Sequence, residues 1–338
     1  MVMLKGYRGP KYLSVFVFAF LMCVLFYHFT NPVPETGKSW FTTSQYVLER
    51  MELDNVLKKA TMANRTVILT TLNEAWSTPG SMIDLFLESF RIGEGTSNLL
   101  NHLVIVAMDP LAFDRCKSIH PHCFFLTTPG VNFTAEKRFM TPDYLKLMWR
   151  RIDFLRIVLE LGYNFVFTDA DIMWFRDPFR YFDSADDIHI ACDFYRGSPR
   201  DKRNRANGGF NYVKSNEATV EFYKYWYMAR FLYPSLHDQS VFEIIKHDSV
   251  IANWGLKIKY LDTRFFGGFC QPSKDISKVC TMHANCCVGI ERKVRDLKLI
   301  LSDWRNFTAR RPEEKKLQVY QPSRRSSPWT APRECTVR

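Results

Sequence analysis

The chain has 338 residues, of which 46% are hydrophobic and 24% are charged, and its formal net charge is +11 at pH 7. This is a globular composition, with room for one large domain or two small ones. The positive charge favours acidic partners, but no nucleic-acid motif occurs and much of the charge lies near the termini, so we expect no nucleic-acid partner.

The N-terminal segment combines positive charge with an apolar run. Lys5, Arg8 and Lys11 precede the apolar residues 12–29, which are at the short end of the length that spans a membrane. A cleaved signal peptide is the alternative, although no small-residue cleavage site follows the run. We expect an uncleaved signal anchor with residues 1–11 in the cytosol, because positive charge stays on that side of the membrane. The remaining chain then lies in the lumen of the secretory pathway.

Composition divides the rest of the chain into three parts. We expect a stem and a leading amphipathic helix over residues 30–62, one lumenal domain over 63–308, and a basic, proline-containing tail over 309–338. Cys23 lies in the apolar run, and the other eight cysteines are an even set, which predicts disulfides in an oxidising compartment. The sequence does not define their pairing. A zinc site is the alternative, but the spacings do not form two close C-x-x-C pairs.

Apolar runs and amphipathic segments alternate at the start of the domain. We predict strands over 67–72, 102–108 and 123–126, and helices over 81–92, 110–119 and 142–161. This alternation is typical of an α/β fold in which helices cover both faces of a parallel sheet. Thr70 and Thr71 lie at the end of the first strand, where such folds usually hold a base and a ribose. No G-x-G-x-x-G or G-x-x-x-x-G-K-[ST] sequence occurs, which argues against a dinucleotide site and a P-loop.

The most informative stretch is a predicted strand over 165–168 that runs directly into Asp169 and Asp171. Its apolar residues predict a buried parallel strand, and ligands of an open α/β sheet lie at the carboxyl ends of such strands. The D-x-D spacing places both side chains on one side of an extended backbone. Two converging carboxylates repel each other unless a cation neutralises them, and oxygen ligands suit Mg²⁺ or Mn²⁺. The stretch predicts a metal–diphosphate site; aspartates that cap a turn are the alternative.

Other polar residues could complete this site. Lys146 and Arg150 lie four residues apart on one helix face, where they would contact a phosphate or only solvent. The glycines after Asn207 suggest close approach of the backbone to a ligand, with an ordinary turn as the alternative. A further helix begins at His237. His283 lies among small and apolar residues, where it is either a hydrogen-bonded core residue or a ligand of Mn²⁺.

Four segments together resemble the plant nucleotide-diphospho-sugar transferases of glycosyltransferase family 77, which contains pectin xylosyltransferases and extensin arabinosyltransferases. The similarity covers residues 65–305 and rests on the segments 163–178, 207–210, 237–239 and 282–289. The resemblance implies a GT-A-like, nucleotide-sugar-binding fold with a Rossmann-type sheet, in a type II Golgi membrane protein. It also implies a UDP-sugar donor, retention at the anomeric carbon, and a cell-wall polysaccharide or glycoprotein as acceptor.

The resemblance further implies roles for single residues. Asp169 and Asp171 match the D-x-D of the family and, with His283, would hold Mn²⁺ or Mg²⁺. The implied catalytic residues are Asp169, Asp171 and Asp238, and Asp238 would act either as a nucleophile or as a contact to the donor sugar. The implied donor-binding residues are Thr70, Thr71, Lys146, Arg150, Asn207, Gly208, Gln239 and Lys293.

Two other functions stay open at this point. Haloacid-dehalogenase phosphatases also carry D-x-D after an apolar strand, but on their first strand, and Met173 stands where they have Thr or Val. A non-catalytic lumenal protein that binds a UDP-sugar or acts as a scaffold would keep the fold without the chemistry. Release of phosphate from simple esters would indicate the phosphatase, and loss of Mn²⁺-dependent UDP binding would indicate the scaffold.

Overall fold

The computed structural model describes residues 43–128, 130–131, 133–310 and 328–335. The predicted signal anchor over 12–29 lies outside these residues, and no described helix is both long and apolar enough to cross a bilayer. The chain divides into two compact units, residues 1–49 and 50–338. Of the first unit, only the beginning of helix α2 (Thr43–Ala60) is described. All that follows concerns the second unit.

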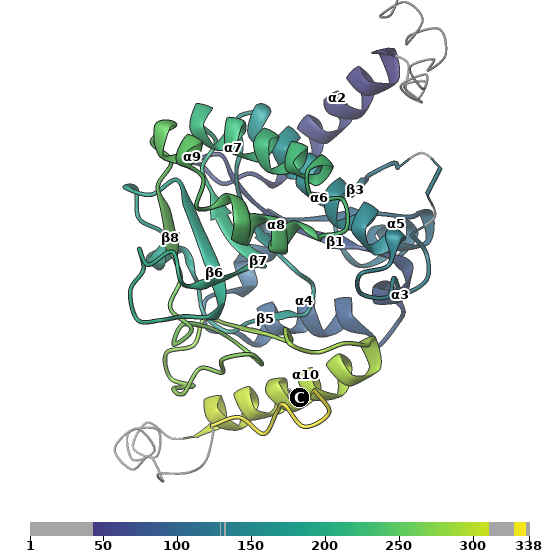
Figure 1. Cartoon of the computed structure of the whole chain (residues 1–338). Coiled ribbons are helices and arrows are strands. Elements are labelled where there is room, and N and C mark those ends of the chain that lie inside the picture. The colour runs from purple at the N-terminus through teal and green to yellow at the C-terminus, as the bar shows by residue number, and fades with distance from the viewer. Residues whose placement is uncertain (1–42, 129, 132, 311–327, 336–338) are drawn as a thin grey trace, which may run out of the picture. The chain divides into compact units, whose positions relative to one another are not determined.

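A seven-stranded sheet forms the centre of this unit, with the strand order β3-β2-β1-β4-β7-β6-β8 (Figure 1). Its strands are β1 (Thr66–Leu72), β2 (Leu103–Ala107), β3 (Cys123–Phe125), β4 (Asn164–Thr168), β6 (Ile188–Phe194), β7 (Arg205–Val213) and β8 (Ile258–Tyr260). Strands β1 to β4 run parallel, whereas β7 is antiparallel to both β4 and β6. The predicted α/β class is confirmed, with one correction. The sheet is mixed, and the D-x-D strand β4 has one parallel and one antiparallel neighbour.

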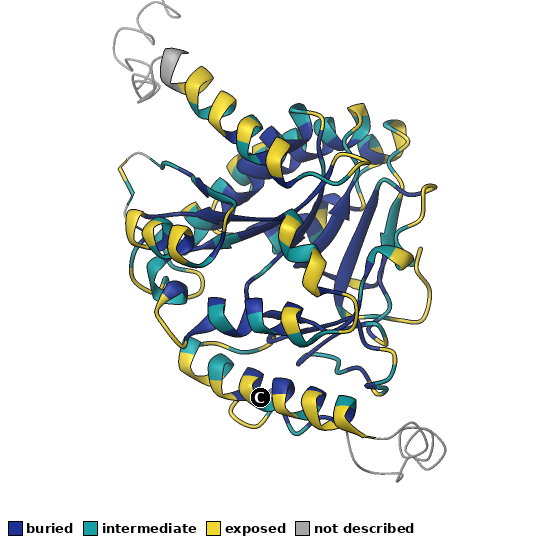
Figure 2. Cartoon of the chain, turned by 180° about the vertical axis from the view of Figure 1, so that it is seen from behind, coloured by how far each residue is buried: buried dark blue, intermediate teal, exposed yellow. Residues whose placement is uncertain are grey.

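Helices cover both faces of the sheet, and Figure 2 shows its strands almost wholly buried. Val67 and Leu69 point to one face, under α6 (Pro142–Glu160), α7 (Glu217–Met228) and α8 (Asp238–Ile245). Ile68 and Leu72 point to the other, toward α4 (Met82–Ile92) and α10 (Ile290–Ala309). Because side chains alternate along a strand, one sheet supplies both cores. The other helices of the described residues are α3 (Glu74–Ser77), α5 (Pro110–Ile119), α9 (Ser249–Asn253), η1 (Ser97–His102), η2 (Phe179–Tyr181) and η3 (Ala229–Phe231).

The structure contains a second, three-stranded sheet that the sequence did not predict. It has the order β5-β10-β9, built from β5 (Ile172–Trp174), β9 (Phe266–Gly268) and β10 (Thr281–His283). Strand β10 is antiparallel to β5, and His283 lies opposite Ile172, the residue after Asp171. Strands of three residues are too short to produce a periodic pattern. This small sheet brings the His283 segment to the D-x-D residues.

The backbone of the D-x-D residues is a turn between β4 and β5, which corrects the extended conformation that we expected. The amide of Ile172 donates to the carbonyl oxygen of Asp169 at 3.2 Å, and the amide of Ala284 donates to that of Asp171 at 3.0 Å. The chain leaves the main sheet for the small one at this turn. The turn, and not strand alternation, therefore brings the two carboxylates together.

Residues 328–335 pack on α10. Trp329 is 5% exposed, and its indole nitrogen donates to the carbonyl oxygen of Ser273 at 2.8 Å. Asp296, on α10, accepts three backbone amides, from residues 333 to 335. The predicted disulfides are present as Cys116–Cys123, Cys270–Cys286 and Cys287–Cys335. Cys192 and Cys280, by contrast, are buried thiols.

Candidate active site

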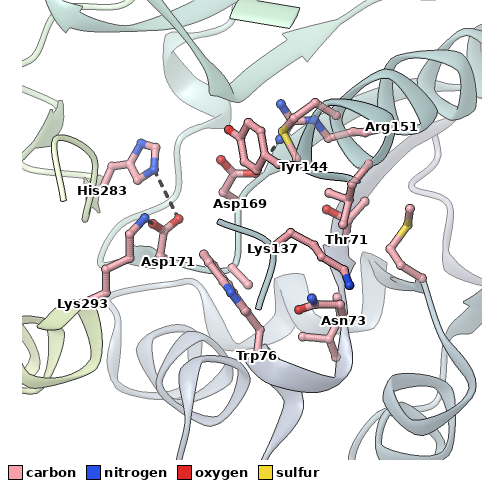
Figure 3. A pocket seen from close by; sticks show the side chains of 15 residues that line it. Thr71, Asn73, Trp76, Lys137, Tyr144, Arg151, Asp169, Asp171, His283 and Lys293 are labelled. Carbon is pink, nitrogen blue, oxygen red and sulfur yellow. Dashed lines mark hydrogen bonds and ion pairs between the residues drawn. The ribbon is translucent and has the colours of Figure 1, made fainter. Parts of the chain in front are cut away.

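A cavity opens where the parallel strands end, and Figure 3 shows the side chains that line it. Thr71 and Asn73 come from the end of β1 and the loop after it, and Asp169 and Asp171 follow β4. Helix α6, strand β10 and helix α10 complete the wall. This is the edge of an α/β sheet at which ligands bind.

Asp169, Asp171 and His283 form a group of metal-ligating side chains. Each offers one ligand atom, and these atoms lie within 4.8 Å of one another. Nε2 of His283 is 3.2 Å from Oδ1 of Asp171, a residue that is 1% exposed. Apart from this ring nitrogen, no donor among the described residues reaches that Oδ1. Incomplete pairing of a buried carboxylate oxygen is costly, and a divalent cation would complete it. Two carboxylates and an imidazole therefore fit Mn²⁺ or Mg²⁺.

The two carboxylates differ in their electrostatic surroundings. Nζ of Lys293 lies 2.6 Å from Oδ2 of Asp171. Although burial opposes ionisation, Lys293 and His283 hold the pKa of Asp171 well below its usual range. Burial raises the pKa of Asp169, and the charge of Asp171 adds to this rise while Arg151 opposes it. The pair thus carries a like-charge repulsion that a bound cation would relieve.

Arg151 is a residue of the site that the sequence analysis missed. Its side chain is 6% exposed and donates to Oδ1 of Asp169 at 2.9 Å and to Oδ2 of Asp238 at 2.5 Å. Burial opposes the ionisation of Asp238, but Arg151 and His237 lower its pKa to about 2. One signal could have identified Arg151. It falls on the buried face of α6, with Met148 and Leu155, whereas cations usually point outward.

Two predicted donor-binding cations do not line the cavity. Lys146 pairs with Asp143 at 3.5 Å. Arg150 pairs with Asp153 at 3.1 Å and donates to the carbonyl oxygen of Thr127 at 3.0 Å. Successive residues on a helix point about 100° apart, so Arg150 and Arg151 have different surroundings.

Thr70 and Thr71, near the end of β1, also have different surroundings. Thr71 lines the cavity, whereas Thr70 is fully buried and is not among the lining residues. Neighbouring side chains of a strand point to opposite faces. Only one of the two predicted hydroxyls therefore reaches the cavity.

A polar cluster around Asp193, at the end of β6, joins three of the predicted residues. Asn207 donates to Oδ1 of Asp193 at 2.7 Å, and Gln239 donates to Oδ2 at 2.9 Å. The amide of Gly208 donates to Oε1 of Gln239 at 3.1 Å. Asn285 adds a fourth side chain, with Nδ2 at 2.8 Å from Oδ1 of Asp193. The sequence analysis did not identify Asp193 or Asn285.

Gly209 allows this cluster and the metal-ligating group to lie side by side. Its carbonyl oxygen accepts the amide of Asp169 at 2.7 Å. A Cβ at this position would stand 2.4 Å from Oδ2 of Asp169 and 2.8 Å from Cε1 of His283. The glycine is therefore required for close approach of β7 to the site.

The segment before α6 closes one side of the cavity. Asn73 donates to the carbonyl oxygen of Phe133 at 3.0 Å, and Glu136 accepts the amide of Ile290 at 3.2 Å. Lys137, between these two attachments and α6, lines the cavity (Figure 3). The sequence analysis did not indicate that a cation of this segment belongs to the site.

Asp183, Asp186 and His189 form a second group with possible ligand atoms, but they do not line the cavity. Nζ of Lys259 lies 2.6 Å from Oδ2 of Asp183, and Arg200 pairs with Asp186. Ion pairs alone do not separate the two groups, because Lys293 and Arg151 also pair with Asp171 and Asp169. The second group differs in that it does not line the cavity and in that Nε2 of His189 already accepts the amide of Asp183 at 3.1 Å. We therefore assign no metal to it.

A family model of nucleotide-diphospho-sugar transferases matches residues 98–297. An uncharacterized protein of Arabidopsis thaliana is 50% identical over 269 residues, which are 79% of this chain and 71% of the relative. A UDP-D-xylose:L-fucose alpha-1,3-D-xylosyltransferase of the same plant is 25% identical over 116 residues, 34% of this chain and 32% of the relative. Among solved structures, a glycosyltransferase involved in glycosylation of the major capsid of PBCV-1 has a TM-score of 0.40 at 11% identity, and the match covers 69% of this chain and 98% of that one. The chain belongs to the nucleotide-diphospho-sugar transferase family and is a glycosyltransferase.

Proposed function

We propose that this glycosyltransferase depends on Mn²⁺ or Mg²⁺ and moves a sugar from a UDP-sugar, with retention, to a cell-wall polysaccharide or a glycoprotein. The observation that carries the proposal is the group of half-buried Asp169 with buried Asp171 and His283 at the cavity. The relative that by its name uses UDP-D-xylose supports the donor class. Family membership removes the phosphatase alternative. We also propose a GT-A-like fold and a Golgi protein with a lumenal domain, anchored through residues 12–29.

Asp169, Asp171 and His283 would hold the cation. When bound, it supplies Lewis-acid stabilisation of the charge that develops on the departing UDP. Lys293 lies in the cavity beside Asp171 and adds a fixed positive charge for the diphosphate. Because the cation and Lys293 place positive charge next to the departing diphosphate, no side chain is required there as a general acid.

Other residues of the cavity suit the rest of the donor. Thr71 and Asn73 lie at the opposite side of the cavity from His283 (Figure 3), where they offer polar groups to a base and a ribose. Trp76 adds a flat aromatic surface. The cluster of Asp193, Asn207, Gly208 and Gln239 does not line the cavity but lies next to it, across Gly209. We assign it to the donor sugar, because its amides and carboxylate match sugar hydroxyls.

Asp238 suits a contact to the sugar better than a covalent role. Its side chain is 1% exposed and is paired with Arg151. A nucleophile would have to leave this ion pair, and breaking a buried pair is costly. We therefore propose that Asp238 and Arg151 position the donor sugar.

The test measures hydrolysis of a panel of UDP-sugars, beginning with UDP-xylose, with Mn²⁺ and with a chelator. Transfer to methyl α-L-fucopyranoside is measured next, because the xylosyltransferase relative is named for an L-fucose acceptor. We expect chelator-sensitive turnover of one donor. Asp171→Ala should lower it at least about 100-fold, because the variant loses a metal ligand.

Asp143→Ala is the matched control, since Asp143 is half exposed on α6 and pairs only with Lys146 among the described residues. Wild-type turnover in Asp171→Ala would contradict the proposal. Failure to hydrolyse any donor, together with no Mn²⁺-dependent UDP binding, would indicate the non-catalytic scaffold instead.

A further inference from the structure

Phe139 and Met140 present apolar side chains to solvent next to the cavity, and they are 52% and 37% exposed. They lie in a tight turn directly before α6. The amide and the hydroxyl of Thr141 donate to the carbonyl oxygen of Arg138 at 3.1 and 2.7 Å, and the Thr141 hydroxyl also caps the helix. The turn is therefore fixed to the start of a long helix.

Three rings form a continuous surface from this turn to the cavity. The ring of Phe139 is centred 5.2 Å from that of Tyr144 and 5.4 Å from that of His237. The centres of the Tyr144 and His237 rings are 6.5 Å apart. Tyr144 also lines the cavity. We call Phe139, Met140, Tyr144 and His237 the aromatic ledge.

The aromatic ledge meets the proposed reaction centre at Asp238. Nδ1 of His237 lies 3.6 Å from Oδ1 of Asp238, and Arg151 joins Asp238 to Asp169. Burial and, next, the charge of Asp238 raise the pKa of the Tyr144 phenol, so its hydroxyl stays protonated. The ledge thus combines an exposed apolar ring with a hydrogen-bond donor beside the site.

We propose that the aromatic ledge is the acceptor subsite, where a pyranose ring of the acceptor glycan stacks its C–H face on Phe139. The inference rests on the proposed function and deepens it. A pyranose has an apolar face and a rim of hydroxyl groups, which match the exposed Phe139 ring and the phenol of Tyr144. His237 adds only its ring face, because its Nε2 contacts the Ser240 hydroxyl at 3.0 Å and its Nδ1 faces Asp238. Recognition of an extended peptide would instead use main-chain groups of a free strand edge, whereas the ledge offers side chains from a turn and two helix starts. Its continuity with the cavity makes a substrate the fitting occupant.

The test is ligand-observed saturation-transfer NMR on the full chain with UDP and Mn²⁺. The probes are methyl α-L-fucopyranoside, methyl β-D-galactopyranoside and methyl β-D-xylopyranoside. We expect saturation of the ring protons of at least one probe. Phe139→Ala should weaken its binding about fivefold, and Phe139→Trp should retain it, because stacking needs an aromatic surface.

Phe231→Ala is the matched control, because Phe231 is 64% exposed and makes no ring–ring contact with the aromatic ledge. The proposal would be overturned if the wild type gave no saturation-transfer signal with any probe, or if Phe139→Ala bound the probe as tightly as the wild type. It would also be overturned if Phe231→Ala lost as much probe affinity as Phe139→Ala, or if Phe139→Ala lowered UDP-sugar hydrolysis as much as it lowered probe affinity. If the wild type hydrolyses no UDP-sugar but Phe139→Ala loses the probe, the proposed enzyme fails and the glycan site stands.

Discussion

At the scale of single residues, Arg151 is the cation that pairs with two carboxylates of the site. Two carboxylates from distant parts of the chain, Asp169 and Asp238, share its guanidinium. Arg151 and Asp238 are almost wholly withdrawn from water, whereas the Asp169 side chain is 27% exposed at the cavity. Solvent therefore cannot compensate Asp238 if the guanidinium is removed. Loss of one partner from such a buried network costs about 3–5 kcal/mol, far more than loss of a surface pair.

We therefore predict that Arg151→Met lowers the free energy of unfolding by about 3 kcal/mol, since methionine keeps volume but leaves the buried carboxylate of Asp238 without its guanidinium. Arg150→Met is the control, because Arg150 pairs with Asp153 and does not line the cavity. Urea unfolding of both variants measures the difference. An equal loss of unfolding free energy in the two variants would show that the pairing of Arg151 with Asp169 and Asp238 contributes no more than the contacts of Arg150.

The sequence identified residues whose spacing is local. Asp169 and Asp171 were visible as a motif after an apolar strand, and the structure brings His283 to them. Arg151 and Lys137 were missed because each looks like an ordinary cation of a helix or loop in the linear chain. Their roles depend on which helix face is buried and where a loop is attached, and both follow from packing between distant segments.

At the scale of secondary-structure elements, two neighbouring disulfides attach the segment after β10 to other parts of the chain. Cys286 is bonded to Cys270, beyond the end of β9, and Cys287 is bonded to Cys335 in the C-terminal segment. The segment is thus tied in two directions, three and four residues after His283. It leads directly to α10 and Lys293. The attachment thus lies between His283 and Lys293, the two cavity groups that approach Asp171.

We predict that Cys270→Ser/Cys286→Ser weakens Mn²⁺-dependent UDP binding about tenfold, because His283 loses a constraint that orients it. The bond has a sequence separation of 16 residues, and its loss should also cost about 3 kcal/mol of stability. Isothermal titration with UDP and Mn²⁺ measures the first effect.

The control is Cys116→Ser/Cys123→Ser, because this disulfide joins α5 to β3 and does not line the cavity. Removal of this bond should lower stability but leave UDP binding intact. If both double variants bind UDP as the wild type does, the disulfides after β10 serve stability alone.

Long periodic elements were predictable from the sequence, and short ones were not. Helix α6 and strand β1 lie within a residue or so of their predicted bounds, because burial of one face imposes a pattern. The small sheet is held together by pairing between β5 and β10, which no local pattern reveals. The mixed direction of the main sheet was likewise invisible, since an apolar strand has the same composition beside a parallel or an antiparallel neighbour.

His189 ties the stability of the whole domain to pH. It lies in β6, fully buried, and packs against the rings of Phe182 and Tyr212. Its Nε2 accepts the amide of Asp183 at 3.1 Å, so that nitrogen carries no proton. Burial lowers the pKa of His189 to about 4; Asp183 opposes the shift, and Lys259 and Lys214 add to it.

The sign of the effect follows from proton uptake. Between pH 6.5 and about 4 the unfolded chain binds a proton at this histidine and the native domain does not, so stability falls as pH falls through this window. We predict that the free energy of unfolding is about 2 kcal/mol lower at pH 5 than at pH 7 on account of His189 alone. Urea unfolding at the two pH values measures the total change. His189→Gln should reduce that change by the same amount, because glutamine does not titrate, whatever its effect at pH 7. A pH dependence as steep in His189→Gln as in the wild type would assign the acid sensitivity to other groups.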